Sequence, residues 1–148
     1  MNLEKQKSAL DLLFYEVEMF NVTSKHLRDG ENDLLQRNVY LESFLIHTRN
    51  LVDFLEDDKF DDDIRCSDFN IQKTSVNLPN GNGKKEINKW LSHITKERII
   101  SAKPLWGFEN IRNEVNKKIL FFLNQLSPAF FPTKLGRTKT DFEVVINL

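Results

Sequence analysis

A segment near the middle of the chain carries polar residues whose types and spacing suit acid–base or phosphate chemistry. Glu42, Arg49 and Asp53 fall at i, i+7 and i+11, which places them on one narrow face of an α-helix, while His47 points into its apolar remainder. Two carboxylates beside a guanidinium form either an internal ion cluster that fixes the packing of the helix or a polar cleft. For His47, the alternatives are a buried ring bonded to a neighbour and a functional group near neutral pH.

A second set of polar residues lies further along the chain, where Lys89 and His93 share a helical face at i and i+4. This is the most basic stretch of the sequence, and Trp90 lies within it. Basic residues interleaved with an aromatic ring can bind single-stranded RNA. The alternative is a solvated basic face with Trp90 in the core or in a dimer interface. The basic residues are Lys84, Lys85, Lys89, Lys96 and Arg98.

Three further features of the sequence, a run of aspartates, a single cysteine and an Asn-Gly turn, do not fit a metal or cofactor site. A run of aspartates lacks the turn glycine and the closing glutamate of a calcium loop. Cys66 is the only cysteine, so no intrachain disulfide and no cysteine-based metal cluster can form. The turn Asn80-Gly-Asn-Gly83 lacks the Lys-Ser/Thr ending of a phosphate-binding loop and is interpreted as a turn before a helix. The aspartates are Asp57, Asp58, Asp61, Asp62 and Asp63.

The totals fit one globular domain. The chain has 148 residues, a formal net charge of −1 and 40% hydrophobic residues, so no bulk basic excess indicates nucleic-acid binding. The polar N-terminus does not resemble a signal peptide, and no apolar run approaches the roughly 20 residues of a membrane span. We therefore expect a cytoplasmic protein with no membrane contact. The chain contains 12 phenylalanines, most of which we expect in the core.

The apolar periodicity predicts an all-α fold, a four- to five-helix up-and-down bundle. Gly30 is suited to end the first helix, and Asn32 or Asp33 to cap the second. The second helix, apolar over a wide arc, should be central and covered on several sides. The C-terminal extension either forms a lone strand that pairs with a partner chain or packs on the bundle. We expect a bundle domain over 1–127, with helices at about 3–28, 33–57, 84–98 and 108–126, a long polar loop over 58–83 that contains short helical turns, and an extension over 128–148.

The order of these polar residues resembles a group of uncharacterised prokaryotic helical proteins. That group carries a Glu-Ser-Phe-Leu-Ile-His-x-Arg-x-Leu-x-Asp-Phe core, then an Asp-rich loop, and then an Asn-Lys-x-x-x-His-Leu-Thr segment. The resemblance covers about residues 34 to 98, and we judge the group similar to the HEPN superfamily of α-helical bundles. In this chain the three parts are Glu42–Phe54, Asp61–Phe69 and Asn88-Lys-Trp-Leu-Ser-His-Ile-Thr95.

The resemblance implies a function and a site. Many HEPN proteins are metal-independent RNases of toxin or antiviral systems, and they usually dimerise so that an Arg-x4-6-His motif of each subunit lines one cleft. The RNA 2′-OH then attacks the adjacent phosphate, His serves as acid or base, and Arg stabilises the phosphate charge. Other members have lost the motif and serve as antitoxins, scaffolds or nucleotide-binding partners.

This chain departs from the motif, because Asn88 stands where Arg is expected before His93. Lys89 follows, and it can hold a phosphate without the bidentate fork of Arg. The missing arginine is alternatively supplied by Arg49 from the neighbouring helix. We expect a homodimer with RNA or a protein as partner, His93 as the acid–base group and Arg49 and Lys89 as phosphate contacts. Glu42 and Asp53 would orient Arg49. The alternative is a non-catalytic interaction module whose buried charges are structural.

Overall fold

The computed structural model describes residues 1–30, 33–57, 60–92 and 105–148, and every regular element within these ranges is helical. The predicted all-α class is therefore confirmed. Two short 3₁₀ turns accompany the α-helices, η1 (Cys66–Phe69) and η2 (Pro128–Phe130). The α-helices are α1 (Leu3–Asp29), α2 (Leu34–Glu56), α3 (Lys84–Ser92), α5 (Phe108–Gln125) and α6 (Lys139–Ile146).

Local capping sets the bounds of the two longest helices. Asn2 accepts a hydrogen bond from the Lys5 N–H at the start of α1, and Gly30, at φ 73°, donates its N–H to the His26 carbonyl at the end. A glycine suits this position because it lacks the Cβ that crowds left-handed backbone. Asp33 then caps α2 through a capping box with Gln36. The predicted end at Gly30 is confirmed, and of the two expected caps of the second helix Asp33 is the one observed.

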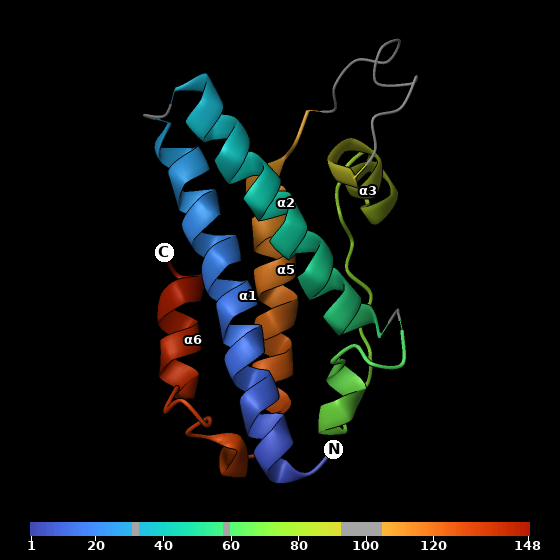
Figure 1. Ribbon diagram of the computed structural model, residues 1–148, viewed down its shortest axis with the longest axis vertical. Coiled ribbons are helices and arrows are strands. Elements are labelled where there is room, and N and C mark those ends of the chain that lie inside the picture. The colour runs from blue at the N-terminus through green and yellow to red at the C-terminus, as the bar shows by residue number, and fades with distance from the viewer. Residues whose placement is uncertain (31–32, 58–59, 93–104) are drawn as a thin grey trace.

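The helix α2 is central, as its wide apolar arc predicts. It packs on α1 along its length and also contacts α3, α5 and η1 (Figure 1). Phe44 of α2 stacks on Phe20 of α1 with ring centroids 4.8 Å apart, and Phe54 meets Phe122 of α5 edge to face at 5.0 Å. Seven of the 12 phenylalanines are buried, which agrees with the expectation that most form the core.

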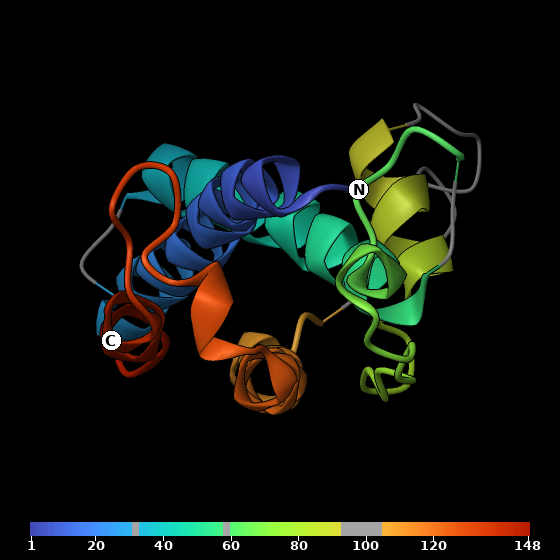
Figure 2. The same ribbon diagram turned by 90° about the horizontal axis from the view of Figure 1, so that it is seen from below.

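The long connection between α2 and α3 is packed against the bundle. The predicted short helical turn is η1, whose Phe69 contacts Phe54 and Phe122 with ring centroids 6.3 and 5.5 Å away. An extended segment follows over 71–79, and its Thr74 N–H donates to the Leu55 carbonyl. Figure 2 shows this segment and α6 on opposite sides of α5.

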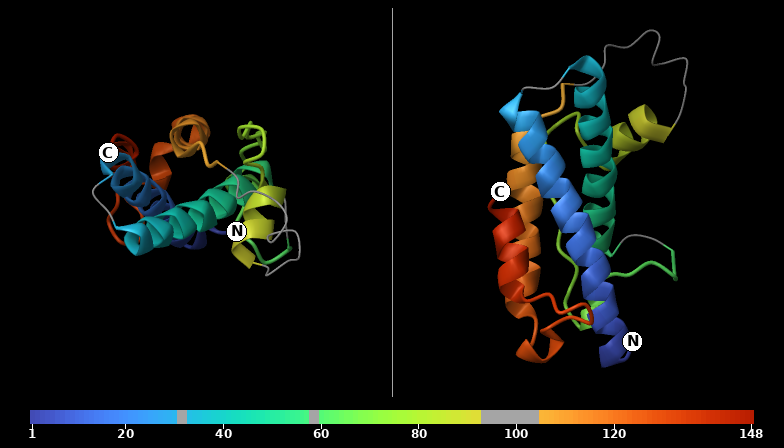
Figure 3. Two further views of the ribbon diagram at one scale, coloured as in Figure 1. Left: turned by 90° about the horizontal axis from the view of Figure 1, so that it is seen from above. Right: turned by 60° about the vertical axis from the view of Figure 1, so that its left-hand side comes forward.

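The C-terminal extension is a helix and not a strand. Thr138 caps α6 through a capping box with Asp141. Phe142 is fully buried and meets Phe14 of α1 edge to face, with ring centroids 5.1 Å apart. Of the two alternatives, packing on the bundle is therefore the one observed, with α6 lying along α1 beside α5 (Figure 3). The capping box at Thr138 and the burial of the Phe142 ring stabilise a helix here in spite of the β-branched residues.

The third predicted helix begins at Lys84 as expected and is described as far as Ser92. Its predicted continuation to residue 98 lies outside the described residues. None of the helices in the described ranges is long and apolar enough to cross a membrane.

Candidate functional site

The polar face of α2 looks toward α3 and solvent. Glu42 and Ile46 are exposed, and Arg49 and Asp53, one and two turns further along, are half-buried. The helix is continuous through all four positions, so the shared face inferred from their spacing follows from its geometry.

The side chain of Arg49 reaches α3. Its Nη1 donates to Oδ1 of Asn88 at 3.3 Å. This hydrogen bond joins α2 to α3 through two residues that are 39 positions apart in the sequence. Asn88 is the position where the resemblance expects an arginine. The guanidinium has one hydrogen bond and no ion pair among the described residues, so most of its five N–H donors and its charge are available.

Among the described residues, Arg49 has no ion pair with Glu42 or Asp53, the two carboxylates that were expected to orient it. Oδ1 of Asp53 lies 2.9 Å from Nζ of Lys84, which also lies 3.7 Å from Oε2 of Glu56. The spacing within α2 alone suggests a pair of Arg49 and Asp53, because these residues are one helical turn apart. The start of α3 instead places an ammonium between Asp53 and Glu56.

Lys89 comes next to Asn88 on α3 and is half-buried. Ile87, two residues before Lys89, is fully buried and anchors the helix against α2. His93, the expected acid–base group, lies outside the described residues. The structure thus brings Arg49 and Asn88 into contact, places Lys89 beside them in sequence, and leaves the position of His93 open.

A small cavity of about 90 Å³ lies between α2 and α3. Since a water molecule takes about 30 Å³ of liquid volume, this cavity has room for only a few waters. Among its described lining residues Glu42 is the one that carries a charge, and the two tryptophans of the chain provide rings. The lining residues are Asn38, Leu41, Glu42, Leu45, Trp90, Leu91 and Trp106.

His47 does not join this face. It is 8% exposed, and its Nδ1 lies 2.6 Å from Oε2 of Glu16 on α1. The same carboxylate oxygen accepts a hydrogen bond from Asn50 at 3.1 Å, and the Tyr15 ring meets the imidazole edge to face at 5.6 Å. These contacts match the interpretation of His47 as a buried residue bonded to a side chain.

Asp57, the first residue of the acidic run after α2, makes structural contacts. Asp57 accepts a hydrogen bond from the Ser67 hydroxyl at 2.8 Å and lies 3.8 Å from the Arg65 guanidinium. Within the described ranges, no group of three or more histidine, cysteine, aspartate or glutamate side chains is placed to hold a metal ion. Cys66 next to this run is 1% exposed, and burial raises the pKa of its thiol.

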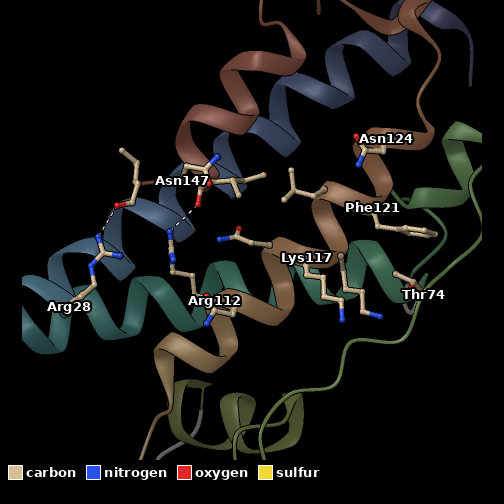
Figure 4. A pocket seen from close by; sticks show the side chains of 13 residues that line it. Arg28, Thr74, Arg112, Lys117, Phe121, Asn124 and Asn147 are labelled. Atoms are coloured by element: carbon tan, nitrogen blue, oxygen red, sulfur yellow. Dashed lines mark hydrogen bonds between the residues drawn. The ribbon is translucent and has the colours of Figure 1, made fainter.

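A basic groove on the outer face of α5 was missed by the sequence reasoning. It has a volume of about 790 Å³, and its lining includes Arg28, Arg112, Lys117 and Lys118 (Figure 4). The sequence signal was the set of cations and asparagines on α5. The prediction used only the apolar stripe of α5. The periodicity of that stripe identifies the buried side of the helix, but it does not show which segments lie beside the exposed side.

The fold and the α2–α3 contacts define an all-helical bundle with a polar contact between its central helix and α3. No family model matches the chain, and no curated protein or solved structure matches it either.

Proposed function

We propose that this chain is a HEPN-like protein of the defence or toxin–antitoxin type, a metal-independent endoribonuclease or a degenerate relative of one. The observation that supports the proposal is the contact between Arg49 and Asn88. The HEPN motif requires an arginine at the position of Asn88, and the guanidinium of Arg49 reaches that position from the neighbouring helix. The motif would then be rebuilt from two helices.

The chemistry follows from the residue types. In RNA the 2′-OH is an internal nucleophile, so cleavage needs no metal or other cofactor if a base removes its proton and a cation stabilises the phosphate. In this proposal His93 removes the 2′-OH proton as the 2′ oxygen bonds to phosphorus. The P–O5′ bond breaks to leave a 2′,3′-cyclic phosphate, and the protonated imidazole gives its proton to the departing 5′ oxygen. Arg49, oriented by Asn88, and Lys89 bind the phosphate, with Arg49 able to offer two parallel N–H donors.

The exposed apolar side chains of α2 support a homodimer. Leu35, Val39 and Ile46 are 73%, 56% and 39% exposed and lie on the same helical face as Glu42 and Arg49. An apolar stripe of this kind is typical of an interface. Two copies packed through this face would bring their Arg49 side chains toward one axis, as the composite cleft of a HEPN dimer requires. A cytoplasmic location remains part of the proposal.

A second candidate function is a non-catalytic helical interaction module. Two observations favour it: the carboxylate of Asp53 is neutralised by Lys84, and that of Glu16 is bonded to His47. Polar groups satisfied in this way hold helices together and are not available to a substrate. In this alternative the α2 face binds a protein partner, and Arg49 has a positioning role.

Cleavage of single-stranded RNA in EDTA tests the proposal, with the oligomeric state measured on a sizing column. We expect His93→Ala to lower the rate by about 10²-fold or more. Arg49→Ala should lower it by about 10²- to 10³-fold, and Arg49→Lys should restore only part of it because the fork is lost.

Matched controls are His26→Ala and Arg37→Ala. His26 is exposed and stacks on Tyr40, and Arg37 is an exposed residue of α2 that contacts the Leu27 carbonyl. Both should leave cleavage unchanged. A folded dimer that cleaves no RNA would favour the interaction module, and cleavage that survives both His93→Ala and Arg49→Ala would overturn the proposed site.

A further inference from the structure

The groove on the outer face of α5 is built from four separate parts of the chain. Its floor is the exposed side of α5, with the end of α1 and the end of α6 on one side and the extended segment at Thr74 on the other (Figure 4). The volume of about 790 Å³ is in the range of small-molecule sites. None of its lining residues belongs to the α2–α3 face. The lining residues that the argument uses are Arg28, Thr74, Arg112, Lys117, Lys118 and Phe121.

The charge of the groove is mainly positive. Four of its described lining residues are cations and none of these residues is an aspartate or glutamate, while the carbonyl oxygen of Leu148 accepts a hydrogen bond from Arg28 at 2.7 Å. Acidic neighbours partly compensate two of them, since Arg28 lies 3.9 Å from Asp29 and Lys118 lies 3.9 Å from Glu114. The other two cations have no ion pair within the described part of the chain. The groove therefore attracts an anion.

Arg112 has spare hydrogen-bonding capacity. Its Nη2 donates to the Ile146 carbonyl at 2.9 Å, and its Nε is buried without a hydrogen-bond partner among the described residues. This one contact fixes the guanidinium at the edge of the groove beside α6. The buried Nε is not accessible to a ligand, and Nη1 makes no hydrogen bond among the described residues. A fixed guanidinium with unused donors is suited to a phosphate or carboxylate.

A ring accompanies the cations. Phe121 is 58% exposed and lies four residues after Lys117 on the same face of α5. Four residues of an α-helix rise about 6 Å, so a single ligand can touch the ammonium with its anionic part and the ring with a planar part. A positively charged groove with an exposed aromatic side chain is the combination that binds single-stranded nucleic acid.

We propose that this groove binds a nucleotide unit, with its phosphate held by Lys117, its base against Phe121 and Arg112 at the opposite edge beside α6. The unit is either a free nucleotide or one nucleotide of a single-stranded RNA. The site goes beyond the proposed RNase function because it uses no residue of the α2–α3 face. Binding here requires neither His93 nor Arg49.

Equilibrium binding of three probes to the full chain tests the proposal. The probes are adenosine monophosphate, pyrophosphate and a single-stranded 2′-O-methyl RNA of about 12 nucleotides, a length within the site sizes of single-strand binding proteins. The 2′-O-methyl group blocks attack by the 2′ oxygen, so the outcome is independent of cleavage. Binding of the monophosphate in competition with the RNA would assign a free-nucleotide site, and binding of the RNA alone would assign a strand site.

Two variants locate the site. Lys117→Gln should weaken binding about fivefold and, for the RNA, lower the slope of log affinity against log salt by about 1. Phe121→Ala should weaken binding about fivefold to tenfold, because it removes a stacking surface. Arg112 is left unchanged in this test since it also holds α6.

Matched controls use the same substitutions on exposed residues outside the groove, Lys134→Gln and Phe60→Ala, and should leave affinity unchanged. The proposal is overturned if neither the monophosphate nor the RNA binds, or if binding is insensitive to both groove variants. If pyrophosphate binds as tightly as adenosine monophosphate and Phe121→Ala has no effect, the groove is a simple anion site. That result also contradicts the proposal. None of these results changes the outcome of the cleavage test with the His93 and Arg49 variants, so the two proposals can fail independently.

Discussion

Nδ1 of His47 in α2 lies 2.6 Å from Oε2 of Glu16 in α1, and this contact joins the two longest helices near their middles. Asn50 donates to the same carboxylate oxygen at 3.1 Å. His47 is 8% exposed, so water cannot readily replace Glu16 as the hydrogen-bond partner of the imidazole. Glu16 therefore satisfies two polar groups of α2 at once.

Removal of this carboxylate should destabilise the bundle. Glu16→Ala leaves the His47 ring nitrogen and the Asn50 amide without their partner, and an unsatisfied buried polar group costs about 1–3 kcal/mol. We expect the free energy of unfolding, measured by urea titration, to fall by that amount. Glu18→Ala is the control, because Glu18 lies on the same helix and has no hydrogen bond or ion pair among the described residues. Equal effects of the two variants would contradict the structural role of Glu16.

The limits of sequence reasoning are visible at this contact. The spacing within α2 predicted its helix and placed His47 in the apolar sector, because both depend on the 3.6-residue period. It did not identify Glu16 as the partner, since the register between two helices is set by side-chain packing. The same limit explains why the spacing pairs Asp53 with Arg49, one turn away, and does not reveal that Lys84 lies beside Asp53 across the helix interface.

The tail shows a different limit. The run Val144-Val145-Ile146 is β-branched and suggested a strand as one alternative. The Thr138-x-x-Asp141 capping box is itself a sequence signal for a helix start, and it decides between the two alternatives. Burial of the tail against α1 depends on tertiary contacts that periodicity over eight residues does not reveal.

The tail should contribute directly to the stability of the bundle. Phe142 is fully buried against Phe14, so Phe142→Ala leaves a cavity and should lower the free energy of unfolding by about 3–5 kcal/mol. Thermal unfolding followed by circular dichroism measures the effect. Val144 is 60% exposed on the same helix, and Val144→Ala should change stability by less than about 0.5 kcal/mol. A small effect of Phe142→Ala would mean that α6 is not part of the cooperative core.

A pair of amides crosses the core between α1 and α5. Asn21 and Asn116 exchange two hydrogen bonds, at 3.1 and 2.7 Å, and both are buried. Asn21→Leu should cost about 1–3 kcal/mol, because it leaves the Asn116 amide unpaired. The double variant Asn21→Leu/Asn116→Leu should be less destabilised than the sum of the single variants, since no orphaned amide remains. Additive effects in a double-mutant cycle by urea unfolding would contradict direct coupling.

Cys66 should make the stability of the protein depend on pH in the alkaline range. Burial, reinforced by the Asp57 carboxylate, raises the pKa of its thiol in the folded chain. Below the ordinary thiol pKa of about 8.5, both the folded and the unfolded chain hold the proton, and the full stability is present. Above it the unfolded thiol ionises and the folded thiol does not, so the free energy of unfolding falls by up to about 1.4 kcal/mol per pH unit until the folded pKa is reached.

The Cys66→Ala variant isolates this effect. It loses the Cys66 thiol, whose Sγ lies 3.4 Å from the Leu55 carbonyl, so it should be less stable than the wild type at neutral pH. As the pH rises past the ordinary thiol pKa, the wild type should lose stability faster than the variant, and the gap between them should narrow. Urea unfolding of both proteins at several pH values from about 7 to 10 measures the gap. A gap that stays constant would show that the thiol titrates alike in the folded and unfolded chains.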